Sequence, residues 1–267
     1  MTDITSMFTW CRATAGTSRP HYLWSVLAAA KLARSLGIER MSAIEFGVAG
    51  GNGLLALESV AELVESLLGV GIDVFGFDSG TGMPEPQDLR DAPFVIQGGN
   101  FPMDVHALET RLSRGRLVLG PVETTAREWL AEEHPPVGFV AFDLDYYTST
   151  MHAFHLLDGD SGRILPRVVC YFDDIFGLGW SDFNGERAAI AEFNEIHTHR
   201  KVGPVHGLKY GLPRTEFELS WPEKIYLAHI FEHDRYSEYE GPLSARWYDE
   251  LRLSPGSRPS RLHPAIR

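Results

Sequence analysis

Ser42 to Glu58 has the sequence SAIEFGVAGGNGLLALE, in which an apolar run gives way to a cluster of glycines and then to a helical pattern. The run from Ala43 to Phe46 is short and ends in glycine, as is typical of a buried parallel strand. From Leu54 onward, apolar residues recur at the three- and four-residue spacing of one buried helix face. A strand, a glycine turn and a helix N-terminus together form a nucleotide site, because free N–H groups and the positive helix end face the ligand.

The turn contains more glycines than an ordinary connection requires, four within seven residues: Gly47, Gly50, Gly51 and Gly53. Gly51-x-Gly53-x-x-Ala56 has the spacing of the dinucleotide fingerprint, but its first glycine comes four residues after the turn begins, so the register is wrong. The pattern E-x-G-x-x-G-G-x-G, which starts at Glu45, fits better. A carboxylate here suits a ligand with a sulfonium and an ammonium and would repel a pyrophosphate. The alternative is a glycine turn without a ligand.

This pattern resembles motif I of the class I S-adenosylmethionine-dependent methyltransferases. The resemblance implies that Glu45 and the glycine turn face the methionine end of S-adenosyl-L-methionine. Asp73 to Ser79, DVFGFDS, is predicted to form the next strand. An acid at the end of this strand can accept hydrogen bonds from a ribose diol, so Asp78, with Ser79 beside it, is the predicted ribose site. Alternatively, Asp78 caps the turn that follows it.

Two further predicted strands end in carboxylates. Val137 to Asp145, VGFVAFDLD, ends in two acids that the period of two places on one face. The strand from Arg167 to Phe172 is followed by Asp173 and Asp174. Open α/β sheets place their chemistry at such strand ends, and three converging carboxylates without a fixed counter-charge call for a hard divalent cation. Oxygen ligands alone indicate Mg²⁺ or Ca²⁺ rather than Zn²⁺.

The segments around these acids allow a closer resemblance. DLDYYTST followed by YFDDIFG is similar to the D-x-D-x-Y-x-S-T and D-D-Y-G segments of the macrocin and mycinamicin type of Mg²⁺-dependent sugar O-methyltransferases. FDSGTGMPEP is similar to the F-D-S-F-E-G-L-P of that family, and the resemblance covers the chain from Glu45 to Phe193. It implies that Asp143, Asp173 and Asp174 hold Mg²⁺ beside the acceptor hydroxyl, and that Asp143 can also act as the catalytic base.

The chain also departs from this family pattern. Thr81-Gly82-Met83 replaces a bulkier run, Ile175-Phe176 replaces Tyr-Gly, and the interval between the two groups of acids is longer. These departures leave open the acceptor and, to a lesser degree, the metal. Asp145 is an alternative third ligand, or else it caps the helix that follows. The pair Asp173-Asp174 could also be a solvated turn.

With this resemblance, the sequence predicts an α/β fold: a Rossmann-like, doubly wound, mostly parallel seven-stranded sheet with helices on both faces and an N-terminal helical extension. Residues 1–40 are expected to be an arm and a helix packed on the core, 41–253 the methyltransferase domain, and 254–267 a mobile tail. Residues 1–18 show little periodicity and are predicted to be the arm. The helix predicted from Pro20 covers a sheet edge or a subunit contact, or its first residues, RPHYLW, reach the active site.

The loop of residues 80–102 is too long to be a simple connection, so we predict that it forms a wall of the site. The loop at residues 121–125 is expected to flank the adenine. His206, Lys209 and His229 are candidate acceptor or base groups, although a lone histidine in a closing strand is more often structural.

The chain has 267 residues, of which 44% are hydrophobic, and a net charge of −12. This size suits one α/β domain, and the negative charge disfavours binding to a nucleic-acid backbone. Cys11 and Cys170 make no disulfide framework, and the sequence contains no signal peptide or long apolar run. We therefore expect a soluble, cytoplasmic protein, able to form a homo-oligomer, whose partner is a small-molecule acceptor rather than nucleic acid or a membrane.

The predicted function is methyl transfer to a hydroxyl oxygen of a small molecule, such as a sugar or a natural product, assisted by a divalent cation. One alternative is a protein that binds the cofactor without transferring the methyl group, although three carboxylates kept together argue against it. The other is a metal-dependent oxygenase on the same fold, against which the missing two-histidine, one-carboxylate signature weighs.

Overall fold

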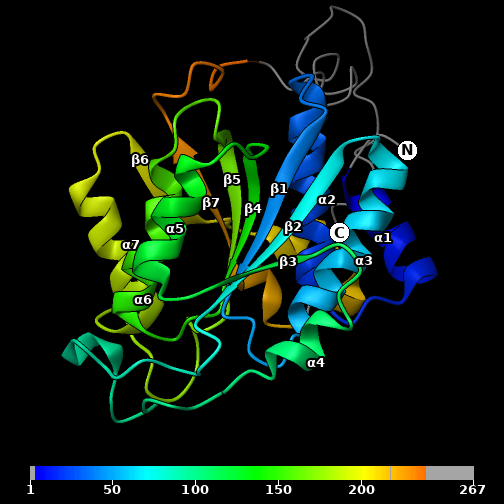
Figure 1. Cartoon of the computed structure of the whole chain (residues 1–267). Helices are drawn as coiled ribbons and strands as arrows, with labels where there is room; N and C mark the ends of the chain where they lie inside the picture. Colours follow the sequence, from blue (N-terminus) through cyan, green and yellow to red (C-terminus); the bar gives the residue numbers. More distant parts are fainter. Residues whose placement is uncertain (1–3, 217, 239–267) are drawn as a thin grey trace, which may run out of the picture. The chain divides into compact units, whose positions relative to one another are not determined.

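The computed structural model describes residues 4–216 and 218–238, and its centre is a seven-stranded sheet with the strand order β3-β2-β1-β4-β5-β7-β6 (Figure 1). Strands β1 to β5 pair in parallel, whereas β7 runs antiparallel to both β5 and β6. The predicted mostly parallel, doubly wound sheet is therefore confirmed. The strands are β1 (Arg40–Phe46), β2 (Gly71–Asp78), β3 (Arg116–Leu119), β4 (Val137–Phe142), β5 (Ile164–Phe172), β6 (Arg200–Pro204) and β7 (Ile225–Ile230).

Helices cover both faces of the sheet, as predicted (Figure 1). One face carries α1 (Ile4–Ala15), α2 (Pro20–Ser35) and α3 (Asn52–Leu68), and the other carries α5 (Val122–Ala131), α6 (Tyr147–Ala153) and α7 (Gly185–Ile196). Helix α4 (Val105–Glu109) precedes β3. Short 3₁₀ segments complete the described elements: η1 (Leu89–Asp91), η2 (Phe154–Asp158), η3 (Leu208–Gly211), η4 (Arg214–Glu216) and η5 (Trp221–Lys224).

The central strand β4 shows why its sequence is apolar without alternation. Phe139 and Ala141 belong to the core under α2 and α3, whereas Val140 and Phe142 belong to the core under α5, α6 and α7. Every residue of β4 is buried. A strand buried on both faces has no polar side, so a continuous apolar run is the expected signature.

The N-terminal region differs from its prediction in two respects. Residues 4–15 form a helix, which the little periodicity of the predicted arm did not indicate, and Phe8 is fully buried, with its ring centroid 5.7 Å from that of Trp221. Helix α2 was predicted to cover a sheet edge or a subunit contact, but it packs on β4 and β5 in the middle of the sheet. This central position brings the first turn of α2 close to the carboxyl ends of the strands, which the third alternative for RPHYLW had anticipated.

The chain divides into a unit of residues 1–237 and a second unit of residues 238–267, of which the structure describes Glu238 alone. The predicted domain boundary at residue 253 and the predicted tail of residues 254–267 lie outside the described residues. Among those that are described, no helix combines the length and the apolar character needed to span a bilayer.

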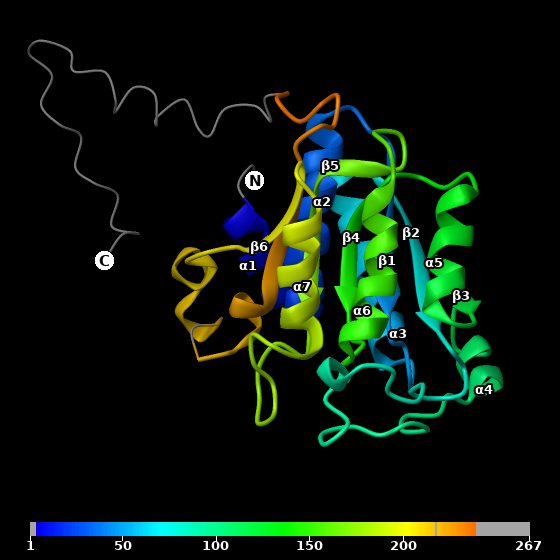
Figure 2. The ribbon, with the colours of Figure 1, turned by 90° about the vertical axis from the view of Figure 1, so that its left-hand side faces the viewer.

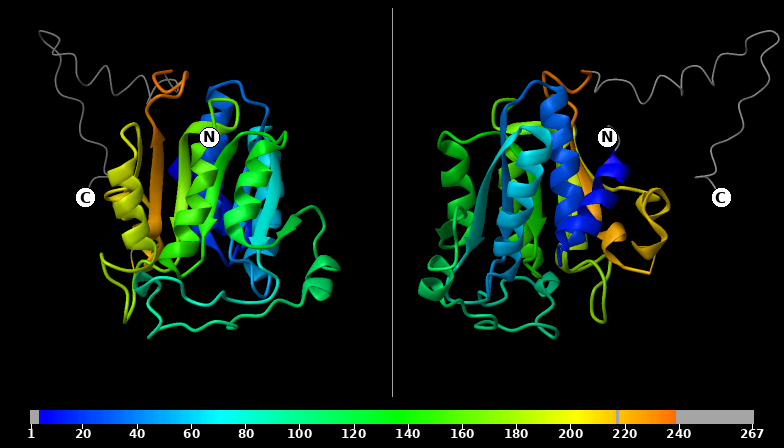
Figure 3. Two further views of the ribbon diagram at one scale, coloured as in Figure 1. Left: turned by 60° about the vertical axis from the view of Figure 1, so that its left-hand side comes forward. Right: turned by 90° about the vertical axis from the view of Figure 1, so that its right-hand side faces the viewer.

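The strand order reverses between β1 and β4, and this reversal determines where a crevice forms. The connection after β1 leads toward β2 and β3, whereas β4 continues toward β5 on the other side. Loops that follow neighbouring parallel strands diverge at such a point and leave a crevice outside the carboxyl ends. Figures 2 and 3 show the long loop after β2 running along this edge of the sheet.

Candidate active site

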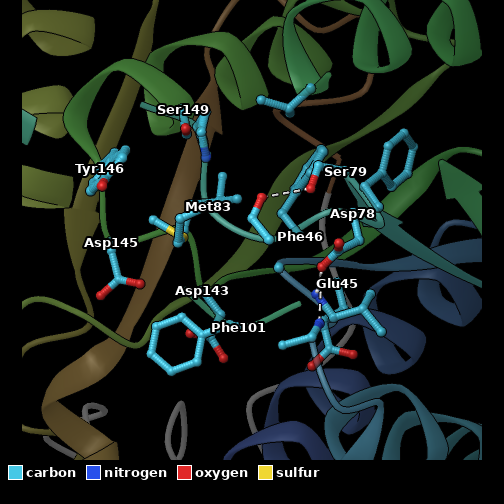
Figure 4. Close-up of a pocket in the computed structure, with 18 of the residues that line it drawn as sticks. Glu45, Phe46, Asp78, Ser79, Met83, Phe101, Asp143, Asp145, Tyr146 and Ser149 are labelled. Atoms are coloured by element: carbon cyan, nitrogen blue, oxygen red, sulfur yellow. Dashed lines mark hydrogen bonds between the residues drawn. The ribbon is translucent and has the colours of Figure 1, made fainter. Parts of the chain in front are cut away.

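A cavity of about 610 Å³ lies at this edge of the sheet. It is lined by the turn after β1, the loop after β2, the start of α5 and the residues that follow β4 and β5. Its walls are strongly acidic, since nine carboxylic side chains line it: Glu45, Asp78, Glu85, Asp91, Glu123, Asp143, Asp145, Asp173 and Asp174. In the view of Figure 4, Glu45 and Asp78 lie on one side of this pocket, Asp145 and Tyr146 on the other, and Asp143 between them.

Backbone hydrogen bonds beyond the strand ends hold these residues together. The N–H of Gly47 donates to the carbonyl of Phe77 at 2.9 Å. In the same way, the N–H of Asp143 donates to Phe46 and that of Asp173 to Phe142, both at 3.0 Å. The parallel ladder therefore continues one residue past each strand, which places the predicted cofactor residues and the predicted metal residues in one cavity.

Glu45 is buried, with 1% of its surface exposed, at the floor of the glycine turn. The hydroxyl of Tyr22, in the first turn of α2, donates to Glu45 Oε1 at 2.6 Å. Glu45 Oε2 has no hydrogen-bond partner among the described residues. Burial raises the pKa of Glu45 to about 7, although the Tyr22 hydroxyl and Arg19 oppose the shift. A buried acceptor without a partner is costly, so this oxygen is suited to a donor on a ligand.

The four glycines of the turn are required for different reasons. A Cβ at Gly47 would lie 1.7 Å from the carbonyl oxygen of Asp143, and φ is +83° there, so the fold itself demands glycine. Gly51 and Gly53 are likewise restricted, by Leu108 and by the Glu45 carboxylate. At Gly50, by contrast, a Cβ would meet no protein atom within 4 Å, and this residue lines the cavity. Gly50 is therefore the glycine that packing leaves unexplained.

We expect Gly50→Val to weaken the binding of a ligand in this turn by roughly 10-fold or more while leaving the melting temperature nearly unchanged. A Cβ at this position meets no protein atom within 4 Å, and Gly50 lines the cavity, so we expect the branched side chain to compete with a ligand rather than with the protein. Gly47→Ala should instead lower the melting temperature, because its methyl group collides with Asp143. Isothermal calorimetry with S-adenosylhomocysteine and differential scanning calorimetry would separate the two effects. Equal affinity in wild type and Gly50→Val would contradict the assignment of this surface to a ligand.

Asp78 has the capping role that the sequence left open, and its binding of a ribose stays a prediction. Its Oδ2 accepts hydrogen bonds from the N–H groups of Val48 at 3.0 Å and Ala49 at 2.9 Å, and its Oδ1 accepts one from Gly80 at 2.7 Å. Asp78 thus caps the following turn and also braces the glycine turn. Both Asp78 and Ser79 line the cavity. The Ser79 hydroxyl donates to the carbonyl of Gly82 at 2.7 Å and so belongs to the same loop network.

Asp143, Asp173 and Asp174 come together as the predicted metal ligands must. One carboxylate oxygen of each lies within 4.8 Å of the others, and in the described part of the chain no second group of this kind could hold a metal ion. The expectation that no fixed counter-charge is present was wrong, because Lys224 Nζ donates to Asp173 Oδ1 at 2.8 Å. The Tyr171 hydroxyl donates to the same oxygen at 2.6 Å.

The electrostatics of this cluster differ from one carboxylate to the next. Burial works to raise the pKa of Asp173, but the hydrogen bonds from Lys224 and Tyr171 outweigh it and bring the pKa below its usual value. Burial, followed by repulsion from Asp174 and Asp173, raises the pKa of Asp143 to about 8. Burial and the charge of Asp173 likewise raise the pKa of Asp174 to about 6. Lys224 therefore pairs directly with Asp173, whereas Asp143 and Asp174 form no ion pair with a described residue.

Asp145 and Glu186 surround Asp174. The strand predicted through Asp145 ends at Phe142, and Asp145 adopts a positive φ of +57°, so the period of two does not place it beside Asp143. Its N–H donates to Asp174 Oδ2 at 3.3 Å, and burial together with Asp174 raises its pKa to about 8. Glu186 on α7 is fully buried and accepts the N–H of Asp174 at 2.9 Å. Hydrogen bonds thus fix the pair Asp173-Asp174 in place, although 38% of the Asp173 side chain remains exposed.

The long loop after β2 lines the cavity, as predicted, and a buried carboxylate that sequence reasoning missed holds it there. Asp91 accepts hydrogen bonds from the N–H groups of Gln87 and Asp88 in its own loop, at 2.8 and 3.0 Å. It also accepts the N–H and the hydroxyl of Thr148, at 2.8 and 3.0 Å. Asp91, and not Asp145, therefore caps the start of α6 and ties the loop to the site.

Other candidates from the sequence do not reach the cavity. His206, Lys209 and His229 are not among its lining residues. Lys209 pairs with Glu223, and His229 bonds the hydroxyl of Tyr236 at 2.8 Å. His229 and His233 have an H-x-x-x-H spacing, but His233 contacts the carbonyl of Ile164 instead of sharing a site with His229. The two cysteines are free and buried.

No protein-family model and no curated protein matches this sequence. Solved structures do resemble it. The calicheamicin methyltransferase CalS11 aligns with a TM-score of 0.51 and 20% identity over 76% of this chain and 88% of that chain. The O-methyltransferase NovP aligns with a TM-score of 0.49 and 13% identity over 66% and 72% of the two chains. The SAH-bound Podospora anserina methyltransferase PaMTH1 gives a TM-score of 0.43 and 14% identity over 85% and 87%.

These identities are low enough that the likeness establishes the fold and no more. Of the three alignments, the one with CalS11 has a TM-score above 0.5, and it covers most of both chains. The seven-stranded mixed sheet described above is thus the Rossmann-like methyltransferase fold.

Proposed function

We propose that this protein is an S-adenosyl-L-methionine-dependent methyltransferase that methylates a hydroxyl oxygen of a small molecule, a sugar or another natural product, with the help of a divalent cation. The observation that carries the proposal is that one cavity contains both Glu45 with its glycine turn and the cluster of Asp143, Asp173 and Asp174. The methyltransferase fold supports the choice of cofactor. The name of CalS11, a calicheamicin methyltransferase, supports a natural-product acceptor.

The residues of the turn fit the proposed cofactor. The unpartnered Oε2 of Glu45 can accept a hydrogen bond from an ammonium, and its charge attracts a sulfonium. Asp78 and Ser79 follow at the end of the next strand, where ribose hydroxyls are bound in folds of this kind. Gly50 offers an open surface at which a ligand can contact the backbone.

The aspartate cluster fits a hard cation. Carboxylate oxygens are the ligands that Mg²⁺ prefers, and the three side chains would hold it without any nitrogen or sulfur ligand. Burial and the neighbouring carboxylates raise the pKa values of Asp143 and Asp174, and a cation bound between them would favour their charged forms. When bound, the cation acts as a Lewis acid that makes an acceptor hydroxyl a better nucleophile.

The chain itself would contribute position and proton transfer. Glu45, Asp78 and the glycine turn would orient the methyl donor. The loop that Asp91 ties to α6 forms another wall of the cavity. Alignment of the attacking oxygen with the methyl carbon can contribute roughly 7 to 11 kcal/mol to the lowering of the barrier. Asp143 lies between the two sides of the pocket in the view of Figure 4, which supports its proposed role as the group that accepts the hydroxyl proton.

Calorimetric titration with S-adenosylhomocysteine tests this proposal, in Mg²⁺ and again in EDTA. We expect micromolar binding under both conditions, because the predicted cofactor residues are separate from the predicted metal ligands. Methyl transfer from labelled S-adenosylmethionine to a panel of sugars and glycosides with neighbouring hydroxyls should then require the divalent cation. The absence of S-adenosylhomocysteine binding under either condition would overturn the proposed function.

A further inference from the structure

Arg19 occupies an unusual position in the acidic cavity. Nine carboxylic side chains line the cavity, and Arg19 is the one Lys or Arg among its described lining residues. It forms no ion pair with a described residue, whereas nearby Lys224 is committed to Asp173. A guanidinium carries five N–H donors in a planar fork that matches a carboxylate. Arg19 thus brings a cationic group without an ion-pair partner among the described residues to a site that otherwise repels anions.

The neighbours of Arg19 define where an anion would bind. Arg19 is the residue that precedes α2, and Tyr22 lies in the first turn of that helix. The Tyr22 hydroxyl donates to Glu45 Oε1 at 2.6 Å and accepts a longer hydrogen bond of 3.5 Å from Arg19 Nη1. A guanidinium and a carboxylate therefore flank a single hydroxyl. The positive end of the α2 dipole adds to the attraction for a negative group beside Arg19.

This arrangement is complementary to an α-amino acid, in which an ammonium and a carboxylate are attached to the same carbon. Glu45 has one oxygen without a partner for the ammonium. Arg19 has free donors for the carboxylate, one hydroxyl away. A ligand with an ammonium alone would leave Arg19 unpaired in the cavity, and one with a carboxylate alone would be repelled by Glu45. Arg19 and Glu45 together are thus expected to favour a zwitterionic ligand over one that carries a single charge.

We infer that Arg19 binds the α-carboxylate of the cofactor while Glu45 binds its α-ammonium, with the Tyr22 hydroxyl holding the two protein groups apart. The inference rests on the proposed function, and it assigns the first turn of α2 to the cofactor site. The packing of α2 on the middle of the sheet then matters for cofactor binding, because a shift of this helix would move Arg19 and Tyr22 together.

The test uses three ligands on the full chain: S-adenosylhomocysteine, its decarboxylated analogue 5′-(3-aminopropylthio)-5′-deoxyadenosine, and 5′-methylthioadenosine, which lacks the amino-acid end. Wild type should bind S-adenosylhomocysteine roughly 10- to 100-fold more tightly than the decarboxylated analogue, as expected for a hydrogen-bonded charged group. In Arg19→Gln this preference should disappear, and the affinity for 5′-methylthioadenosine should stay the same. Arg19→Lys should keep part of the preference, because it keeps the charge without the fork.

Arg34→Gln is the matched control, since Arg34 is an exposed arginine on the same helix and does not line the cavity. It should keep the wild-type preference. If Arg19→Gln still prefers S-adenosylhomocysteine as strongly as wild type, or loses affinity equally for all three ligands, Arg19 does not bind the carboxylate and the inference is overturned. Failure of the proposed function has a different signature, because wild type would then bind neither S-adenosylhomocysteine nor 5′-methylthioadenosine.

Discussion

Asp143→Asn is expected to lower methyl transfer by roughly 10²- to 10⁴-fold, the range that a positioned proton acceptor contributes, while the affinity for S-adenosylhomocysteine stays at the wild-type value. Asparagine keeps the volume of the side chain but removes the negative charge. The cluster with Asp173 and Asp174 then loses one anionic oxygen of three. Transfer assays in Mg²⁺, together with calorimetric titrations of Mg²⁺ and of S-adenosylhomocysteine, would measure the two effects separately.

The same substitution should stabilise the metal-free protein at alkaline pH. The pKa of Asp143 is raised from 3.8 to about 8 in the folded state, so its favourable contribution to folding is fully present below about pH 4 and is lost as the pH rises through 8. The amide does not ionise and escapes this loss. In EDTA at pH 9, the melting temperature of Asp143→Asn should therefore exceed that of wild type, and at pH 4 the difference should vanish.

Asp234→Asn is a suitable control, because Asp234 is exposed and does not line the cavity. It should change neither transfer nor the pH dependence of melting. Full transfer activity in Asp143→Asn would show that Asp143 is neither base nor ligand. A collapse of S-adenosylhomocysteine affinity in this variant would show that the cofactor and metal residues do not act as separate groups.

The elements that sequence reasoning located correctly are those with local patterns. The strand from Arg40 to Phe46, its glycine turn and the helix that follows combine a short apolar run, a glycine cluster and a helical period in adjacent residues. Helix α1 does have a helical spacing of apolar residues, since Ile4, Met7, Phe8 and Cys11 lie on one face that packs in the core, but the exposed Trp10 between them obscures it in the sequence. This helix contacts residues some 200 positions along the chain, because Phe8 packs near Trp221 and Arg12 pairs with Glu216.

The residues missed at the site are contributed by elements distant in sequence. Lys224 reaches Asp173 from 51 residues away because η5 leads into β7, which pairs antiparallel with β5. Tyr22 reaches Glu45 because α2 packs across the middle of the sheet. No spacing within either segment encodes these contacts. The alternative in which RPHYLW reaches the active site was the one prediction that included Tyr22. No feature of the sequence near Lys224 indicated that this residue lies at the site.

The glycine turn illustrates a different limit. Four glycines in seven residues predicted a turn that binds a ligand, with a glycine turn without a ligand as the alternative. In the structure, Gly47 and Gly53 are required by contacts with Asp143 and Glu45. Contacts within the protein therefore account for glycine at Gly47, Gly51 and Gly53, and they leave Gly50 as the position where a ligand is the predicted reason.

Glu45→Gln is expected to weaken S-adenosylhomocysteine binding by roughly 100-fold or more, the effect of breaking a buried charge pair. In the wild type, one oxygen of the Glu45 carboxylate accepts the Tyr22 hydroxyl and the other has no described partner. The amide of the variant would offer the ligand's ammonium either a weaker acceptor or a repelling N–H donor. Because burial raises the pKa of Glu45 to about 7, the wild-type affinity should also rise as the pH increases through 7. Calorimetric titrations at pH 6, 7 and 8 would show a slope in wild type and none in the variant.

Glu58→Gln provides the matched comparison, since Glu58 is another buried glutamate, on α3, that does not line the cavity. Its Oε1 accepts the N–H groups of Ser113 at 2.9 Å and Arg114 at 2.6 Å, so this variant should melt at a lower temperature and yet bind S-adenosylhomocysteine with the wild-type pH slope. The comparison would then show that Glu58 contributes to folding stability and Glu45 to cofactor affinity. If Glu45→Gln binds S-adenosylhomocysteine with the wild-type affinity and the wild-type pH dependence, Glu45 does not contact this ligand. Its unpartnered oxygen would then bind some other ligand.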